Sequence, residues 1–132
     1  MTDLTLSGAT YETRADADFF FTRGQVADLV QTYLRGADAK QPLASPLLGP
    51  LAGLPPVRIH VGDEEVLLDD SLRYAERAVA AGVDAQVDVW MGMPHGFTGS
   101  IGRLKASAQA LDAIGTFLTE KLLADAGSHP AR

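Results

Sequence analysis

The sequence predicts an α/β fold in which a short parallel sheet is flanked by helices. Two apolar stretches of strand length, Val57–Val61 and Ala85–Trp90, are separated by a stretch with helical periodicity, and a second helical stretch follows. The order strand, helix, strand, helix is that of a βαβ unit, whose two strands run parallel. The chain has 132 residues, 46% hydrophobic and 21% charged. That is enough for one domain with a core.

The first part of the chain, residues 1–56, is expected to form a helix and a long loop. Thr22 is a suitable N-cap for a helix from about Gly24 to Arg35, and Gly36 is suited to end it. Proline and glycine punctuate the loop that follows, up to Pro56. The segment Leu4-Thr5-Leu6 is a weak candidate for a third strand. The apolar face of the helix is expected to comprise Val26, Leu29, Val30, Tyr33 and Leu34.

The second part, residues 57–124, contains the βαβα unit, and residues 125–132 are expected to be a frayed tail. An acidic loop follows the first strand, and Asp69 or Asp70 is suited to cap the next helix, which continues to about Ala81. Side chains alternate along the second strand, as in an edge strand. We expect one partial domain over residues 1–132. The apolar positions of the middle helix are Leu72, Ala75, Ala78 and Val79, and those of the last helix run from Leu104 to Leu122.

The predicted sheet is too small to be complete. Two parallel strands are marginal alone, and parallel sheets are usually covered on both faces. We therefore expect part of a larger sheet to be missing. Uncovered strand edges and apolar helix faces favour association. A two-fold homodimer is the expected form, because it is the commonest closed arrangement.

Composition argues against several classes of partner. The net charge of −6 and the pI near 4.8 disfavour binding to nucleic acid and to anionic membranes. No apolar run approaches the length of a membrane span, and no basic region precedes an apolar stretch at the N-terminus. We expect a cytoplasmic protein. The chain has no cysteine, and its histidines lack the spacing of a zinc site, so neither a metal nor a cofactor is expected.

Two loops carry candidate catalytic groups. Asp63, Glu64 and Glu65 follow the first strand, and His95 follows the second. Parallel neighbouring strands end at the same edge of a sheet, where α/β proteins bind ligands. A carboxylate and a histidine brought together there have the arrangement in which an acid fixes the tautomer of a general base. His60, inside a strand, is expected to be a packed or hydrogen-bonded residue.

Several ordered strings resemble the C-terminal part of the hormone-sensitive-lipase family of α/β-hydrolases, over about Thr2 to Leu123. The resemblance implies an α/β-hydrolase fold and carboxylic ester hydrolysis. The strings are Asp3-Leu4-Thr5-Leu6-Ser7-Gly8, Ala44-Ser45-Pro46-Leu47, Leu54-Pro55-Pro56, Gly62-x-x-Glu65-x-Leu67-x-Asp69, Ala80-Ala81-Gly82-Val83 and Trp90-x-Gly92-Met93-Pro94-His95-Gly96-Phe97.

The resemblance assigns catalytic roles. It makes His95 the general base and places Glu65 at the triad acid, with Asp63 and Glu64 as rival assignments. The family also needs a Gly-x-Ser-x-Gly nucleophile motif and a His-Gly-Gly oxyanion motif. Neither string occurs in these 132 residues.

We therefore expect the sequence to begin after the nucleophile. The chain would contribute the acid and histidine of a Ser-His-acid triad and be inactive alone, while the complete enzyme acts on a small ester. The alternative is a non-catalytic remnant that associates with itself or with a partner.

Overall fold

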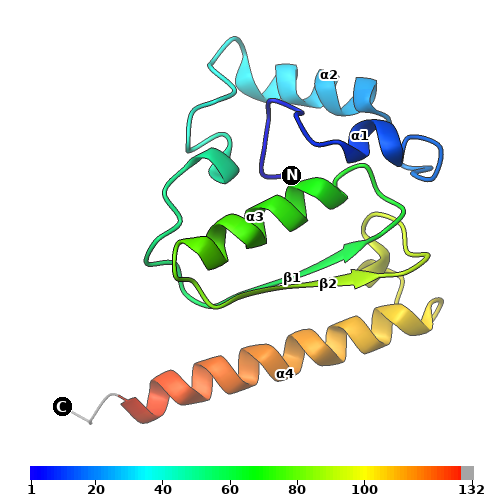
Figure 1. Ribbon diagram of the computed structural model, residues 1–132. Coiled ribbons are helices and arrows are strands. Elements are labelled where there is room, and N and C mark those ends of the chain that lie inside the picture. The colour runs from blue at the N-terminus through cyan, green and yellow to red at the C-terminus, as the bar shows by residue number, and fades with distance from the viewer. Residues whose placement is uncertain (129–132) are drawn as a thin grey trace. The chain divides into compact units, whose positions relative to one another are not determined.

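A computed structural model describes residues 1–128 (Figure 1). The described elements are α1 (Thr10–Thr13), α2 (Arg23–Leu34), the 3₁₀ turn η1 (Pro46–Leu48), β1 (Val57–Gly62), α3 (Leu68–Ala80), β2 (Ala85–Trp90), the 3₁₀ turn η2 (Phe97–Gly99) and α4 (Lys105–Ser128). The chain forms two compact units, the first comprising Met1–His95 and the second beginning at Gly96. The predicted α/β class is confirmed.

β1 and β2 pair in parallel, and the register is level from Val57 opposite Ala85 to Gly62 opposite Trp90. α3 packs across one face of both strands, as Figure 1 shows. Leu51, Ala78 and Val83 form a small core there, against which Val57 and Ala85 pack. Within the described residues the sheet has these two strands.

The candidate third strand, Leu4-Thr5-Leu6, is wrong. These residues form a turn in which the Leu6 amide donates to the Asp3 carbonyl at 3.3 Å, and Leu6 has a φ of 54°. Leu4 and Leu6 instead enter the main core of the first unit, where their apolar side chains are buried. The other buried members of that core are Tyr11, Val26, Val30 and Val66.

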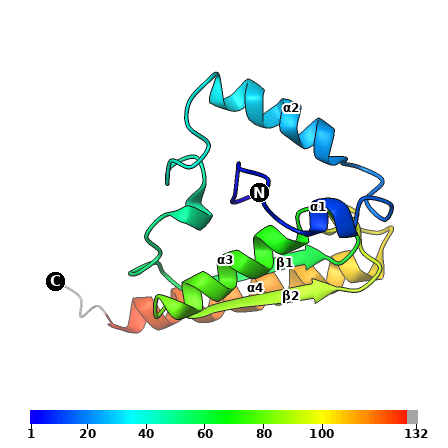
Figure 2. The same cartoon turned by 45° about the horizontal axis from the view of Figure 1, so that its top comes forward.

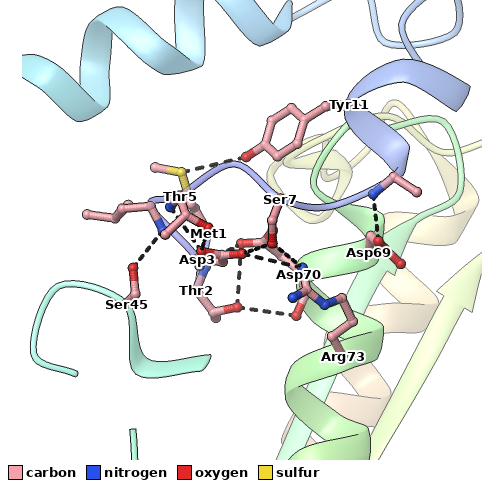
Figure 3. Close-up of polar contacts among 12 residues, drawn as sticks. Met1, Thr2, Asp3, Thr5, Ser7, Tyr11, Ser45, Asp69, Asp70 and Arg73 are labelled. Atoms are coloured by element: carbon pink, nitrogen blue, oxygen red, sulfur yellow. Dashed lines mark hydrogen bonds and ion pairs between the residues drawn. The ribbon is translucent and has the colours of Figure 1, made fainter. Parts of the chain in front are cut away.

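The expected capping role of Asp69 and Asp70 is also wrong. α3 begins at Leu68 and has no side-chain cap. The Asp70 carboxylate accepts the amides of Thr2 at 2.5 Å and Asp3 at 3.0 Å, and that of Asp69 accepts the Ala9 amide at 2.7 Å (Figure 3). Both acids therefore fasten the start of the chain to α3.

Asp3 is the centre of the polar contacts drawn in Figure 3. Its fully buried carboxylate accepts the hydroxyls of Thr5 and Ser7 and lies 3.3 Å from the Arg73 guanidinium. Burial by itself raises the pKa of Asp3. The hydrogen bonds from Ser7 and Thr5, together with the charge of Arg73, outweigh burial and hold the pKa below its usual value. The buried acid is therefore a stabilised anion.

α2 starts where the sequence predicts. Thr22 and Gln25 form a reciprocal capping box, in which each side chain accepts the other residue's amide. The predicted apolar face is only partly correct. Val26 is buried, whereas Leu29 and Tyr33 remain 56% and 69% exposed.

Two further helical faces are less buried than the sequence predicts. In α3 the predicted core positions Leu72 and Val79 are 40% and 56% exposed, while Ala75 and Ala78 are buried. In α4 the apolar side chains of Leu118 and Leu122 are 49% and 67% exposed.

α4 continues through residues 125–128 of the stretch expected to be a tail, and residues 129–132 lie outside the described part. No helix in the described residues is both long enough and apolar enough to cross a membrane.

Candidate active site

The site lies in the first unit, where β1 and β2 end side by side. Because Gly62 pairs with Trp90, the loops that follow leave the same edge of the sheet at the same level (Figures 1 and 2). We name residues 63–67 the acid loop and residues 91–95 the histidine loop. The crossover through α3 therefore places the two loops side by side.

Backbone contacts join the two loops directly. The amide of Asp63 donates to the Trp90 carbonyl at 3.1 Å, and the amide of Glu64 donates to the Met93 carbonyl at 3.2 Å. The Gly92 amide in turn donates to the Asp63 carboxylate at 2.6 Å. These bonds fix the spacing between the two loops.

Gly62 makes this close approach feasible. A Cβ atom at Gly62 would lie 1.9 Å from the carbonyl oxygen of Met93 and 2.7 Å from its carbonyl carbon. No real side chain fits into that space. The glycine that ends β1 is therefore required by the neighbouring loop and not by an unusual backbone angle.

Glu65 and His95 meet across these loops. Glu65 Oε2 lies 2.7 Å from His95 Nδ1, and Glu65 Oε1 accepts the Gly62 amide at 2.8 Å. The Glu65 side chain is 6% exposed and that of His95 is 41% exposed. In the tautomer that donates from Nδ1 to the Glu65 carboxylate, Nε2 is left without a proton. The expected contact is present.

The rival acids have other positions. The Asp63 carboxylate binds the Gly92 amide, and Glu64 contributes its backbone amide to the contact with Met93. Among the described residues, Glu65 is the acid that contacts His95. The geometry thus separates Glu65 from Asp63 and Glu64, a choice that the sequence leaves open.

His60 belongs to a different set of contacts. Its side chain is 5% exposed, and its Nδ1 accepts the Trp90 indole N–H at 3.0 Å. Asp88, which also pairs with Arg58, lies 3.5 Å from the same nitrogen. Burial lowers the pKa of His60, and Asp88 opposes this shift only in part. His60 is a packed, hydrogen-bonded residue, as expected.

Sequence reasoning missed the residues that surround the pair. The Phe21 ring contacts the His95 ring edge to face, with centroids 5.1 Å apart. Asp18, which is 6% exposed, accepts the backbone amides of Phe20 and Phe21 and that of Val66, the residue after Glu65. An aspartate that accepts amides two and three residues ahead is a local turn signal, and Asp18 ahead of Phe19–Phe21 fits it. Its bond to the Val66 amide joins residues 48 apart in sequence and has no local sequence signal.

Three serine hydroxyls in the described residues have structural partners. Ser45 donates to the Ala39 carbonyl, Ser7 to Asp3, and Ser107, in the second unit, to the Phe97 carbonyl. His95 has no hydrogen bond to a serine hydroxyl within that part of the chain. No group of three His, Asp or Glu residues able to hold a metal ion occurs there either. Within the described residues, the site is thus an acid–histidine pair in which no serine hydroxyl is hydrogen-bonded to the histidine.

The sequence of residues 1–99 matches the family described as alpha/beta hydrolase fold. An acetyl-hydrolase from Streptomyces hygroscopicus is 35% identical over 116 residues, which cover 88% of this chain and 39% of that protein. Esterase LipU from Mycobacterium tuberculosis is 40% identical over 78 residues, 59% of this chain and 26% of that protein. Other relatives are named as an esterase, a carboxylesterase/phospholipase and a hormone-sensitive lipase.

Solved structures agree with the fold. A crystal structure of an esterase from the bacterial hormone-sensitive lipase family superposes with a TM-score of 0.89 at 39% identity, covering 91% of this chain and 40% of that one. A hormone-sensitive lipase from a metagenome library gives 0.89 at 38% identity, covering 92% and 42%. The chain therefore belongs to the α/β-hydrolase fold family, and the solved structures that it resembles include members of the hormone-sensitive lipase family. The chain spans between about a quarter and two fifths of the length of these relatives.

Proposed function

We propose that this chain supplies the histidine and the acid of a Ser-His-acid triad in a carboxylic ester hydrolase. The observation that carries the proposal is the buried Glu65 carboxylate, 2.7 Å from Nδ1 of a half-exposed His95. In such a pair the acid holds the imidazole in the tautomer whose Nε2 is basic, and stabilises the imidazolium that forms. The esterase and acetyl-hydrolase names of the relatives support ester chemistry.

The proposed reaction has two steps. A serine from outside these 132 residues attacks the ester carbonyl while His95 Nε2 takes its proton. The same proton passes to the departing alkoxide, which leaves as the alcohol, and an acyl-serine remains. Water then attacks the acyl-serine, His95 takes its proton, and the carboxylic acid leaves as the proton returns to serine. This chemistry needs neither a metal nor a cofactor.

A hollow in the first unit is a candidate for the apolar part of the ester. Its volume is about 360 Å³, and it lies beside Phe21, whose ring contacts His95. Aromatic and aliphatic side chains at such a wall favour a modest acyl or alkyl group over a charged one. The residues that line it are Phe20, Phe21, Gln25, Asp28, Leu29 and Thr32.

A chimera tests the catalytic roles. The part of the Streptomyces acetyl-hydrolase that this chain does not cover would be joined to the chain, and hydrolysis of short-chain aryl esters would be measured. We expect saturable turnover. His95→Ala should lower kcat by about 10⁴–10⁶-fold, and Glu65→Gln by about 10⁴-fold, as for other triads.

Asp63→Asn and Glu64→Gln are the matched controls, because they change neighbouring acids that do not contact His95. Both should leave kcat within a few-fold of the parent chimera. If Asp63→Asn abolished turnover and Glu65→Gln did not, the assignment of the acid would be wrong. A folded chimera in which His95→Ala keeps full turnover would refute the proposal.

The 132-residue chain alone should show no saturable esterase activity. A lone imidazole cleaves activated aryl esters slowly, and without a shaped pocket it gains little from proximity. Saturation kinetics from the pure chain, lost in His95→Ala, would reveal a nucleophile within it. A soluble chimera that stays inactive would instead favour the non-catalytic binding module.

A further inference from the structure

Asp18 lies at the junction between the acid loop and the segment that carries Phe21. Its carboxylate is buried, with the residue 6% exposed. Oδ1 accepts the amides of Phe20 and Phe21, each at 2.9 Å, and Oδ2 accepts the Val66 amide, also at 2.9 Å. One carboxylate therefore holds two segments that are 48 residues apart in sequence.

The Val66 bond bears directly on the proposed acid, because the Val66 nitrogen belongs to the peptide group that follows Glu65. The other side of Val66 is held as well. Its carbonyl accepts the Thr10 hydroxyl at 2.7 Å, and the Thr10 oxygen accepts the Asp69 amide at 3.0 Å. Val66 itself is fully buried. Both backbone groups of Val66, the residue that follows Glu65, are therefore held by side chains of the first 18 residues.

The Phe21 bond bears on the histidine. Holding the Phe20 and Phe21 amides fixes the turn from which the Phe21 ring projects, and that ring meets the His95 ring at 81°. The His95 ring is thus held by the Glu65 carboxylate and packed against Phe21. Both neighbours are connected to Asp18.

We propose that Asp18, assisted by Thr10, is a positioning residue for the Glu65–His95 pair; this rests on the proposed function of that pair. Asp18 is not a rival acid, because its two oxygens are occupied by backbone amides. Its effect is geometric. Removal of the Asp18 carboxylate releases both the peptide group after Glu65 and the turn that carries Phe21. The Glu65 carboxylate and the His95 imidazole are then no longer held in position relative to each other.

The contact can be observed in the 132-residue chain by proton NMR of the His95 ring. A proton held between Nδ1 and a buried carboxylate gives a far-downfield resonance that exchanges slowly with water. We expect it in the parent chain and its loss in Glu65→Gln, which assigns it. Asp18→Ala should lose it or broaden it beyond detection.

Asp3→Asn is the matched control, because Asp3 is also a buried carboxylate that accepts several hydrogen bonds. It should lower stability and leave the resonance in place. A folded Asp18→Ala chain with the resonance unchanged would overturn the proposal, as would its loss in Asp3→Asn under conditions where that chain is folded.

Milder variants cover the case in which Asp18→Ala does not fold. Asp18→Asn keeps one oxygen that accepts the Phe20 and Phe21 amides. Its NH₂ group would face the Val66 N–H, and because both groups are donors that hydrogen bond is lost. The resonance should therefore weaken. Thr10→Val removes the hydroxyl that holds the Val66 carbonyl, whereas Thr10→Ser keeps it. The resonance should be perturbed in Thr10→Val and retained in Thr10→Ser; equal spectra for all three variants would contradict the proposal.

The active chimera gives a second readout. A displacement of about 1 Å in a catalytic group costs on the order of 10²-fold in rate. Asp18→Asn should therefore lower kcat by about 10- to 100-fold and leave KM within about twofold. Full turnover in Asp18→Asn with loss in Glu65→Gln would defeat the positioning role and spare the proposed function. Full turnover in Glu65→Gln would defeat the proposed function, and the NMR result would still decide whether Asp18 holds the pair.

Discussion

Gly62 is the residue on which the contact between the acid and histidine loops depends. A Cβ atom there would overlap the Met93 carbonyl at 1.9 Å, so Gly62→Ala must push the histidine loop away. We expect a loss of about 1–3 kcal/mol in the free energy of unfolding, as for other overpacked sites. Urea unfolding measures it, and the His95 ring proton should disappear as well.

Gly24→Ala is the control for that change. A Cβ at Gly24 would meet nothing nearer than the Thr22 hydroxyl oxygen at 3.9 Å, and the position lies in the first turn of α2. Stability should stay equal or rise by up to about 1 kcal/mol, since alanine is the better helix former. Equal stability of Gly62→Ala and the parent chain would contradict the close approach.

His60 should make the stability of the fold depend on pH. Burial lowers its pKa in the folded chain, while in the unfolded chain the pKa is about 6.5. As the pH falls below that value, the unfolded state binds a proton that the folded state does not hold. The free energy of unfolding therefore falls with decreasing pH, by up to about 1.4 kcal/mol per pH unit, until the folded pKa is reached.

His60→Gln removes that proton and keeps an acceptor for the Trp90 indole, which donates to His60 Nδ1 in the parent chain. Urea unfolding between pH 7 and pH 5 should show a smaller loss of stability in the variant. Parallel pH profiles for the two chains would show that His60 is not the titrating group.

At the scale of an element, α3 is an anchor for the start of the chain. Asp70 is 2% exposed and accepts two backbone amides from residues 67 and 68 positions away. Hydrogen bonds to a charged group contribute about 1.5–3 kcal/mol each, so Asp70→Ala should lower the free energy of unfolding by about 3 kcal/mol. The shift of the urea midpoint at an unchanged m-value measures this.

Asp69 offers the comparison on the same turn. Its bond to the Ala9 amide is exposed to solvent, so Asp69→Ala should cost about 1 kcal/mol or less. Equal losses from the two substitutions would mean that both aspartates act through the helix dipole, to which each contributes a first-turn charge.

At the scale of the whole molecule, apolar side chains remain uncovered on several elements. Leu29 and Tyr33 of α2, Val79 of α3 and Leu122 of α4 are each at least 56% exposed. Such surface favours association, so we expect the chain to form a two-fold dimer. Sedimentation equilibrium over a range of concentrations measures this.

The active chimera is the comparison for association. If the added segment covers the exposed apolar surface, the chimera should associate less than the chain alone at the same concentration. A compact monomer of the chain at high concentration would show that the exposed apolar residues do not drive association.

The sequence by itself determines the elements and the edge at which the site forms. Strand and helix periodicities, the Thr22 cap and the glycines that follow α2 and α3 are local signals. They are local because backbone hydrogen bonds in helices and turns join residues close in sequence. The βαβ order then requires parallel strands, so the acid loop and the histidine loop lie at the same edge of the sheet. The pairing of an acid with His95 follows from this topology.

Only the tertiary structure decides which groups meet there. Glu65, and neither Asp63 nor Glu64, reaches His95, because the Gly62 amide and the contact between the loops set the rotation of the acid loop. Asp69 and Asp70 bind amides of Thr2, Asp3 and Ala9, far away in sequence, and do not cap α3. The contacts of Asp18 and Thr10 with Val66 span 48 and 56 residues. No local periodicity predicts such pairs, because these hydrogen bonds form only when the folded chain brings distant residues together.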